Sequence, residues 1–528
     1  MTLHEAIKAM ADEIASVLSN NKPSIYLYGS VVLDDFKLGW SDIDILVLTE
    51  FEITEEQASK LVSLRQNMLE KYPGNPYFRL FEGGMLSLDA LLNNTKERTV
   101  YWGTSGQRIT DSYKVDSFGM AELLDSGVLL HGDDIRGKMV YPSYAQMRDD
   151  IAWHVQDARK YGAVVGWLLD IARGIYTLRT GKVIAKTAAG EWALKNNLCP
   201  DADAMRKAVQ CRKEPHLMQE KSIDNSIIQR FADVIDAEFA NTAERFAHSE
   251  LQRMNIAYDT LSLIRSKNGV SVWRVNSENG SVVIKCFDKP EYRREIANYH
   301  LLKSLGIPTL ELIAHTDCSF VMEDIICSKY RLATEEDTSD PDIAIKIAQW
   351  YKMLHQNGRG YANTHPIFDE CDAITVENIH KIKERTGTGG LPVWALIEEN
   401  IDKIFSAATS LPRTLNYNDF YYTNLVVARD GSSALMFDYH LLGKGYIYSD
   451  IRNVCSSLGS DDAKKAFLTE YGYFDESEKL VDDVVDPLYS LYIACQRESF
   501  PNWANDLLAK LKDGTLLMAV EKLLEGTV

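Results

Sequence analysis

The chain has 528 residues, of which 45% are hydrophobic and 25% are charged, so disorder, collagen-like repeats and low complexity do not describe it as a whole. Its 57 Lys and Arg stand against 76 Asp and Glu, a net charge of −19. That balance argues against binding nucleic acid or an anionic membrane, because both need an excess of cations. It suits a cationic small molecule as partner, although solubility alone explains the charge equally well. At about 150 residues per domain, two to four domains are expected.

The cysteines and the N-terminus indicate the compartment. The eight cysteines include no Cys-x-x-Cys pair and none beside a histidine at zinc-ligand spacing, so we expect scattered thiols in a reducing environment. The first residues are partly acidic and helical in spacing, unlike a signal peptide. No apolar run approaches the ~20 residues of a membrane span. We therefore expect a cytoplasmic protein.

The N-terminal half is predicted to be α/β followed by all-helical. The α/β pattern consists of a helix over 1–20, strands at 24–28 and 43–48, a helix over about 55–72, and strand-like runs at 77–81 and 84–88. From 147 to about 255 long helical periodicity takes over, as in 164–178 and 225–246. We therefore predict an α/β domain at 1–146 and a helical domain at 147–255.

The C-terminal half begins with a predicted hairpin, in which strands 270–275 and 281–287 flank an Asn-Ser-Glu-Asn-Gly turn. A helix over 291–305 follows and ends at Gly306-Ile307-Pro308. A further strand ends at 320–324, and the rest is helical apart from 413–442. No Pro/Gly/Ser-rich linker connects the two halves. The sequence also shows no internal repeat. We place a separate domain at 256–528, with lobes at about 256–326 and 327–528.

The first group of candidate site residues is Gly29-Ser30 with Asp42 and Asp44. Two carboxylates one residue apart on a strand point the same way, so both can bind the same Mg²⁺ ions. Gly29 lets the backbone approach a phosphate closely, and Ser30 offers a hydroxyl. This set suits nucleotidyl transfer, in which an acceptor hydroxyl attacks the α-phosphorus of a nucleoside triphosphate. The alternative for an isolated Asp-x-Asp is an ordinary acidic turn entering a strand.

The segment 26–48, Tyr-Leu-Tyr-Gly-Ser through Ser-Asp-Ile-Asp-Ile-Leu-Val-Leu, resembles the nucleotidyltransferase superfamily and in particular the streptomycin/spectinomycin adenylyltransferases. The segment 169–193 is similar to the helical-domain signature of those enzymes. The resemblance implies that Arg173 and Lys186 contact nucleotide phosphates; solvated helix charges are the alternative.

A general base is also implied by this resemblance, on a strand beside the aspartate pair. Two residues are candidates, Glu82 in Leu-Phe-Glu-Gly-Gly and Asp89 in Ser-Leu-Asp-Ala, and we favour Glu82 because it starts a strand-like run. The acidic drug-contacting residues expected upstream of Arg173 are replaced by Arg159 and Ala163. That departure leaves the identity of the acceptor open.

The second group of candidate site residues has the layout of a kinase. Lys285 ends a Val-Val-Ile-Lys strand, and Glu295 follows on a helix, where a kinase lysine that holds the α/β-phosphates finds its glutamate. Asp419 precedes Asn424 by five residues, and Asp438 ends the apolar strand after the next turn. In kinases such residues are the proton acceptor and the two Mg²⁺ ligands. A surface lysine on an edge strand is the alternative for Lys285 alone.

This block resembles the aminoglycoside phosphotransferase and choline kinase families. The resemblance implies a hinge at 323–325, with Glu323 next to adenine, and an aspartate, Asp450, that braces the catalytic loop. It departs from the pattern where Tyr417 replaces the usual histidine, and where the phosphate loop, 268–271, has a single glycine. Lys285, Asn424 and the two aspartates are all retained, which favours a competent kinase.

Together these observations predict a mixed α/β and α protein, a nucleotidyltransferase domain with a helical bundle followed by a bilobal kinase-like α+β domain. The function we expect is a bifunctional antibiotic-modifying enzyme that uses Mg²⁺ and ATP, with GTP as an alternative in the kinase half. The N-terminal half would adenylylate streptomycin or spectinomycin, and the C-terminal half would phosphorylate an aminoglycoside-like hydroxyl. The rivals are one catalytic half with a regulatory module, and a protein-modifying or housekeeping small-molecule transferase.

Overall fold

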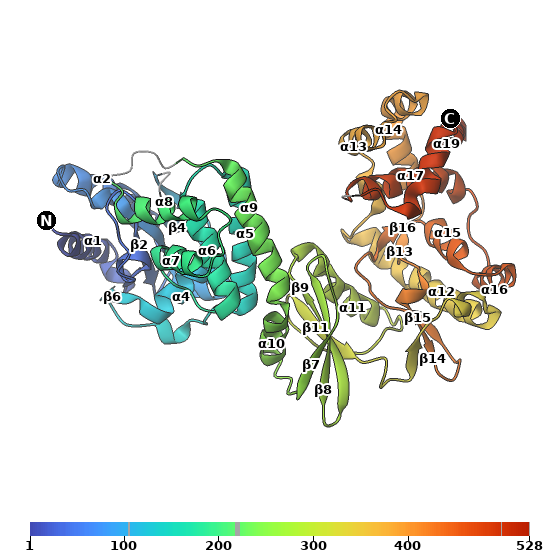
Figure 1. Cartoon of the computed structure of the whole chain (residues 1–528), viewed down its shortest axis with the longest axis horizontal. Helices are drawn as coiled ribbons and strands as arrows, with labels where there is room; N and C mark the ends of the chain where they lie inside the picture. Colours follow the sequence, from blue (N-terminus) through green and yellow to red (C-terminus); the bar gives the residue numbers. More distant parts are fainter. Residues whose placement is uncertain (104–105, 217–221, 498, 527–528) are drawn as a thin grey trace. The chain divides into compact units, whose positions relative to one another are not determined.

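The computed structural model describes residues 1–103, 106–216, 222–497 and 499–526 (Figure 1). The chain forms two compact units, 1–253 with 266–269 and 254–265 with 270–528. None of the helices in these described ranges is long and apolar enough to cross a membrane. The finer division of the first unit at residue 146 stays a prediction.

The first unit is built on a mixed sheet of six strands, counted over its described residues, in the order β5-β4-β3-β2-β1-β6. Only β2 and β3 pair in parallel; the other neighbours are antiparallel. Strand β1, which lies between β2 and β6, is buried along its whole length, as expected of an apolar run covered on both faces. The strands are β1 (Ser24–Tyr28), β2 (Ile43–Thr49), β3 (Phe81–Ser87), β4 (Thr99–Gly103), β5 (Gly106–Thr110) and β6 (Val128–His131).

Alternating residues of the strands enter two different cores. Ile25 and Leu27 of β1 pack with α1 and α2, whereas Tyr26 and Tyr28 pack on the opposite face with residues of α3 and α4. This follows from the two-residue period of a strand. Helices α1 and α2 each begin with a capping box, at Thr2 and Thr54. The four helices are α1 (Leu3–Val17), α2 (Glu55–Lys71), α3 (Leu88–Asn93) and α4 (Ser117–Ser126).

A helical bundle follows in the same unit, around a core that includes Leu168, Ile175 and Phe231. The single helical run expected at 225–246 is split at Thr242, whose hydroxyl accepts a hydrogen bond of 2.8 Å from the buried Arg148 guanidinium. The helices are α5 (Tyr144–Tyr161), α6 (Gly166–Thr180), α7 (Lys186–Lys195), α8 (Ala202–Lys213), α9 (Asn225–Asn241) and α10 (Ala243–Arg253).

The second unit begins with a sheet in the order β10-β11-β9-β8-β7, next to helix α11. The predicted hairpin is present: β8 and β9 pair antiparallel from Val270↔Phe287 to Ser277↔Gly280. Gly280 has φ +119°, which suits a glycine at this turn. The elements are β7 (Thr260–Lys267), β8 (Val270–Ser277), β9 (Gly280–Phe287), α11 (Arg294–Ser304), β10 (Leu312–His315) and β11 (Ser319–Glu323).

The rest of the second unit is mainly helical, with two small sheets that hold the candidate catalytic residues. One sheet has the order β12-β14-β15, and the other pairs β13 with β16. The strands are β12 (Tyr330–Leu332), β13 (Thr414–Asn416), β14 (Leu425–Ala428), β15 (Ala434–Met436) and β16 (Gly443–Gly445). The helices are α12 (Pro341–Thr364), α13 (Val376–Thr386), α14 (Pro392–Ser410), α15 (Ile447–Ser457), α16 (Asp461–Tyr471), α17 (Glu478–Cys495), α18 (Asn505–Lys512) and α19 (Thr515–Gly526).

The expected fold class is confirmed, with local exceptions. The strand-like run at 77–81 is instead a short 3-10 helix, Phe78–Leu80. The cause is local: the Asn75 side chain accepts the Tyr77 N–H at 2.8 Å, a turn that competes with strand pairing. Strands β4, β5 and β6 were not predicted at all, since short strands whose burial depends on distant helices leave a weak periodic signal.

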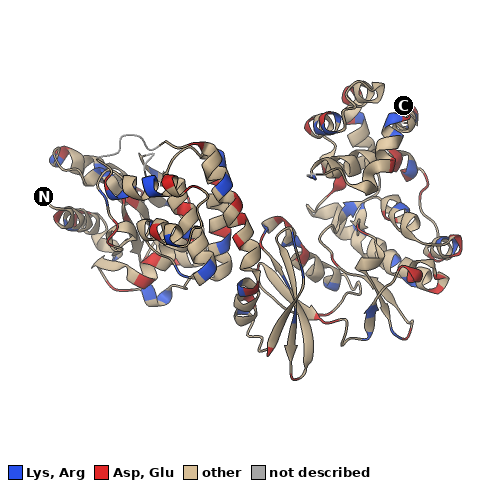
Figure 2. Ribbon diagram, in the orientation of Figure 1, with Lys and Arg blue, Asp and Glu red and all other residues tan. Residues whose placement is uncertain are grey.

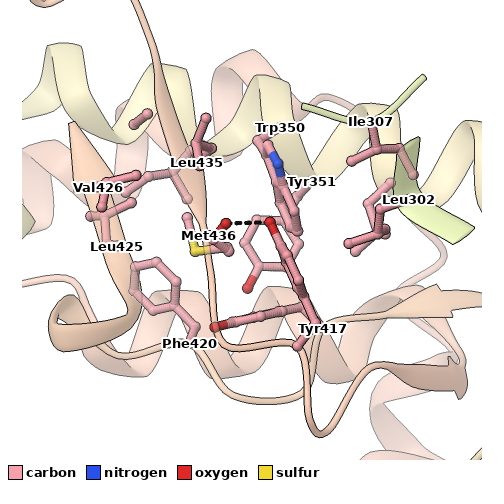
Figure 3. Close-up of a cluster of buried hydrophobic side chains, with 14 of the residues drawn as sticks. Leu302, Ile307, Trp350, Tyr351, Tyr417, Phe420, Leu425, Val426, Leu435 and Met436 are labelled. Carbon is pink, nitrogen blue, oxygen red and sulfur yellow. Dashed lines mark hydrogen bonds between the residues drawn. The ribbon is translucent and has the colours of Figure 1, made fainter. Parts of the chain in front are cut away.

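An aromatic cluster fixes the base of the catalytic loop in the second unit (Figure 3). Trp350 and Tyr417 meet edge to face with ring centroids 5.8 Å apart, and both are buried. The Trp350 indole N–H donates to the Pro308 carbonyl at 2.9 Å, and the Tyr417 hydroxyl donates to the Phe437 carbonyl at 2.5 Å. Tyr417, which replaces the expected histidine, thus has a structural place in the core.

Tyr417→Phe should lower the free energy of unfolding by about 1 kcal/mol, because the buried Phe437 carbonyl loses its donor while the ring packing is kept. Urea unfolding followed by tryptophan fluorescence measures this. Tyr473→Phe, at a side chain that is 91% exposed, is the matched control and should leave the midpoint unchanged. Equal midpoints for the two variants would contradict the role given to the Tyr417 hydroxyl.

Candidate active sites

Strands β2 and β3 bring three of the predicted carboxylates together in the first unit. Asp44 of β2 is paired in register with Glu82 of β3, and Asp42 lies just before β2. Gly29 ends β1 with φ +72°, and a Cβ added there would lie 2.1 Å from Asp44 Oδ2. Only glycine fits between the backbone and this carboxylate. The Ser30 hydroxyl donates to the Asp42 carbonyl at 3.3 Å, so the two loops are tied together.

These carboxylates line a pocket of about 390 Å³ within the first unit, a volume in the range of small-molecule sites. The pocket holds every nucleotidyl-transfer residue predicted in this half except the alternative Asp89. The predicted residues that line it are Gly29, Ser30, Asp42, Asp44, Glu82, Arg173 and Lys186, and Trp40, Tyr101, Glu122 and Arg212 join them.

Burial disfavours the negatively charged forms of Asp42 and Asp44. Burial and the proximity of Glu82 raise the pKa of Asp42 to about 6. Burial, followed by the negative charges of Glu122, Asp42 and Glu82, raises the pKa of Asp44 to about 7. Nearby cations such as Lys186 offset this only in part. A divalent cation would relieve the repulsion, so the donor set fits Mg²⁺.

The protein supplies only part of a metal's coordination shell here. Across the described residues no group of three or more His, Cys, Asp and Glu is arranged to hold a metal by itself. Mg²⁺ is usually bound by one or two carboxylates together with substrate phosphates and water, and Asp42 and Asp44 match that smaller requirement.

Arg173 and Lys186 reach the pocket, and each has an acidic partner. Arg173 of α6 forms an ion pair with Glu122 of α4, and its guanidinium lies 4.6 Å from the centroid of the Phe118 ring. Lys186 at the start of α7 lies 2.6 Å from Asp170. Sequence reasoning missed Glu122, because no motif spacing marks it and its partner lies 51 positions away.

The two general-base candidates are placed differently. Glu82 lines the pocket and accepts a hydrogen bond of 2.9 Å from the Tyr101 hydroxyl. Asp89 lies in the first turn of α3, accepts from the Asn93 amide at 2.8 Å, and is not among the described residues that line the pocket. The geometry favours Glu82.

The positions where acidic drug contacts were expected do not join this pocket in the described structure. Arg159 lies on α5 and pairs with Asp233 at 2.8 Å and Asp236 at 2.6 Å. Ala163 follows α5 with φ +64° and is exposed.

In the second unit, Lys285 contacts Glu295, the partner expected for it, and also Asp438, a contact that was not predicted. Lys285 Nζ lies 2.6 Å from Glu295 Oε2 and 3.0 Å from Asp438 Oδ1. Although burial acts to lower the pKa of Lys285, Glu295 and Asp438 raise it, so the lysine stays charged. Burial acts to raise the pKa of Asp438, but Lys285 and a 2.9 Å hydrogen bond with His440 hold it below its usual range.

The predicted proton acceptor and the predicted metal ligand Asn424 are in contact. The Asn424 amide donates to Asp419 Oδ2 at 2.8 Å, which fixes the orientation of the carboxylate. Burial raises the pKa of Asp419 to about 6, with nearby Asp438 adding to the rise and His440 opposing it. A carboxylate poised in this range can accept a proton near neutral pH.

Asp450 holds the backbone of the catalytic loop. Its fully buried carboxylate accepts the N–H groups of Tyr417 at 2.9 Å and Asn418 at 3.0 Å, and His355 Nε2 lies 3.1 Å away. Asn418 has φ +64°, a left-handed conformation that such bonds can hold in place. The bracing role implied by the resemblance is thus matched by geometry.

The predicted hinge at Glu323 and the predicted phosphate loop at 268–271 match the kinase pattern less well than Lys285 and Glu295 do. Glu323 ends β11; its N–H donates to the Glu311 carbonyl at 3.0 Å, and its carboxylate accepts the Glu311 N–H at 2.8 Å. The N–H and the carboxylate of Glu323 are thus both engaged with Glu311. Asn268 and Gly269 both have positive φ, so the predicted phosphate loop is a tight hairpin turn rather than a glycine-rich flap.

An acidic group near Asp419 was not foreseen. Asp482 of α17 accepts from the Tyr446 hydroxyl at 3.0 Å and from Arg452 at 2.7 Å, and Arg452 also contacts Asp486 at 3.2 Å. The Glu370 carboxylate has neither a hydrogen-bond nor an ion-pair partner in the described part of the chain. Burial, reinforced by Asp486 and other aspartates and opposed by Arg452, raises the pKa of Glu370 to about 8.

Comparisons with known proteins agree with the N-terminal site. A nucleotidyltransferase domain model matches residues 9–81, and the model of the C-terminal domain of aminoglycoside adenylyltransferase matches residues 142–238. The N-terminal half therefore matches both of these domain models in chain order, and the chain is a transferase. The predicted resemblance is confirmed.

A search of curated proteins found no match. Solved structures similar to the chain include a choline kinase from Streptococcus pneumoniae, at 15% identity and a TM-score of 0.38 over 54% of this chain and 99% of that chain. A spectinomycin adenyltransferase from Enterococcus faecialis with ATP and spectinomycin has 16% identity and a TM-score of 0.36 over 44% and 99%. A spectinomycin phosphotransferase in complex with ADP and spectinomycin has 10% identity and a TM-score of 0.33 over 53% and 97%.

Glu370→Gln should stabilise the protein at alkaline pH. The raised pKa means that the folded state binds this proton more tightly than the unfolded state, so wild-type stability falls as pH rises from about 4.5 to about 8. The variant lacks this loss and should gain about 4 to 5 kcal/mol at pH 9 and nothing below pH 4. Urea unfolding across pH, with exposed Glu384→Gln as control, measures the gain; a gain independent of pH would contradict the assignment.

Proposed function

We propose that the chain is a bifunctional antibiotic-modifying enzyme with two separate nucleotide sites. The N-terminal half would transfer AMP from ATP to a hydroxyl of an aminoglycoside or aminocyclitol of the streptomycin or spectinomycin type. The C-terminal half would transfer the γ-phosphoryl group to a hydroxyl of an aminoglycoside-like molecule. The observation that supports this proposal is that the candidate carboxylates and cations predicted for each half lie close together within its own unit.

In the N-terminal half, Gly29 and Ser30 would lie against the triphosphate, and Arg173 and Lys186 would bind its oxygens. Asp42 and Asp44 would hold Mg²⁺, which neutralises the triphosphate and polarises the α-phosphorus when bound. Glu82 would accept the proton of the acceptor hydroxyl. The hydroxyl oxygen then forms a bond to the α-phosphorus as the bond to pyrophosphate breaks.

In the C-terminal half, Lys285, oriented by Glu295, would bind the α- and β-phosphates, and the segment after Glu323 would meet adenine or guanine. Asn424 and Asp438 would hold Mg²⁺. Asp419 would accept the hydroxyl proton while the acceptor oxygen attacks the γ-phosphorus and ADP leaves. Asp450 would keep the backbone around Asp419 in the required shape.

A cationic acceptor suits the kinase half on electrostatic grounds. Glu370 is an unpartnered carboxylate, as far as the described residues go, with Asp482 and Asp486 nearby. An ammonium group bound there would compensate its charge. Along the described ribbon of both units, positions of Lys and Arg are interspersed with positions of Asp and Glu (Figure 2).

Two rival functions have specific support and specific tests. Retention of only one activity would make the other half a nucleotide-sensing module, and the single glycine of the 268–271 turn favours the kinase-like half for that role. A protein-modifying or housekeeping transferase would label proteins or another small molecule instead. Against it stands the match of 142–238 to a domain found in aminoglycoside adenylyltransferases.

Incubation with Mg-ATP labelled at either the α- or the γ-phosphate, over a panel of aminoglycosides, should give two kinds of product. Asp44→Asn should remove only the α-labelled product and Asp419→Asn only the γ-labelled one, each by a factor of at least about 10² because a metal ligand or general base is lost. Product masses identify the drug. Absence of label on every drug would refute the antibiotic-modifying function, and labelled protein would support the protein-modifying rival.

Glu82→Gln should reduce adenylyl transfer by about 10²- to 10⁴-fold, the usual contribution of a general base, while the binding of Mg-ATP is retained. Asp89→Asn is the matched control and should keep wild-type activity. Single-turnover rates with the best acceptor provide the measurement. The reverse result, a large loss in Asp89→Asn alone, would move the base from β3 to α3.

A further inference from the structure

Asp35 is a buried carboxylate that none of the proposed catalytic steps uses. It lies in the loop between Ser30 and Asp42, is 5% exposed, and lines the nucleotide pocket. Its own N–H donates to the Ser30 carbonyl at 2.9 Å, so it is fixed to the loop expected to bind phosphate.

The partners of Asp35 lie in the helical bundle, far along the chain. Its carboxylate accepts the Thr187 hydroxyl at 2.5 Å and the Thr187 backbone N–H at 3.3 Å. It also accepts from Arg212 Nε at 3.0 Å, and the two side chains of this ion pair are only 7% and 5% exposed. Trp40, on the same loop, packs against the core of the helical bundle.

Helix α7 has no cap of its own. It begins at Lys186, and its N-cap residue is Ala185, which provides no side-chain hydrogen bond. The first N–H groups of a helix need an acceptor, which Ser, Thr, Asp or Asn at the N-cap usually supplies. Asp35 accepts the N–H of Thr187, the second residue of the helix, and so takes over this role from another part of the chain.

The capped residue, Thr187, is adjacent to Lys186, whose positive charge is disfavoured at the start of a helix. A lysine at a helix N-terminus faces the positive end of the helix dipole. The negative charge of Asp35 at the same turn offsets this, while Asp170 lies 2.6 Å from the lysine Nζ. Without Asp35, the first turn of α7 would lose both an acceptor and a compensating charge.

We propose that Asp35 is a positioning residue for the N-terminal nucleotide site: it caps α7 from outside and thereby holds Lys186 at the pocket. This rests on the proposed nucleotidyl-transfer function, in which Lys186 binds phosphate. Asp35 itself touches no reacting atom. Its effect is to tie the phosphate-binding loop and the phosphate-binding lysine to each other.

The test must separate positioning from loss of the buried ion pair, since removing one partner leaves Arg212 uncompensated and can unfold the unit. Asp35→Ala is therefore combined with Arg212→Met, which removes both charges. Dissociation constants for a non-hydrolysable Mg-ATP analogue are measured on the full chain carrying Lys285→Met, so that binding reports the N-terminal site. Asp34→Asn, at an exposed neighbour with φ +55°, is the control.

The double variant should remain folded and bind the analogue about 3- to 30-fold more weakly, the range expected for loss of a helix cap. Adding Ala185→Ser gives α7 a cap of its own and should restore most of the affinity. A merely structural tie between loop and bundle would not be rescued by that change. Asp34→Asn should bind like the parent protein.

Two results would overturn the inference. Unchanged affinity in the folded double variant would show that Asp35 does not position Lys186, while leaving the proposed function intact. If the double variant binds the analogue more weakly and Ala185→Ser does not restore the affinity, capping of α7 is not the way in which Asp35 acts. If the parent protein with intact Asp35 binds no analogue, the proposed function of the N-terminal half fails, and this inference fails with it.

Discussion

The interaction on which both candidate sites depend is the repulsion between carboxylates held close together away from water. Removing a carboxylate from water disfavours its charged form, and a second carboxylate nearby disfavours it further. In the first unit, burial first of all, and then the charges of Glu122 and Asp42, raise the pKa of Asp44 to about 7. The second unit offsets such repulsion with Lys285, which lies between Glu295 and Asp438. The two sites thus differ in whether a lysine lies between the buried carboxylates and compensates their charge.

The arrangement of cations explains why the negative charge of the carboxylates in the first site is not balanced. Arg173, Lys186 and Arg212 all reach the pocket, but each is paired with an acid on a neighbouring element, respectively Glu122, Asp170 and Asp35. The Arg173–Glu122 and Arg212–Asp35 pairs connect the helical bundle to the sheet domain, whereas Lys186–Asp170 lies within the bundle. None of these three ion pairs involves Asp42 or Asp44, so the three cations do not directly pair with either aspartate.

Features set by neighbouring residues could be predicted from the sequence. Asp42 and Asp44, Gly29-Ser30, and the Asp419–Asn424–Asp438 set are local, so strand alternation and turn composition were enough to find them. Asp35 with Arg212 could not be found this way, because 177 positions separate them and only the packed fold brings them together. Glu370 near Asp419, and strands β4 to β6, were missed for the same reason: their environment is made by distant segments.

The central claim is that one chain carries two independent nucleotide sites, and binding stoichiometry tests it most directly. Calorimetric titration of the full chain with a non-hydrolysable ATP analogue in Mg²⁺ should give two molecules bound per chain. GTP analogue is titrated in parallel, because the kinase half can prefer guanine. Asp44→Asn should abolish binding of one of the two analogue molecules, and Lys285→Met should abolish binding of the other. A single molecule bound per chain, abolished by either substitution, would contradict the account.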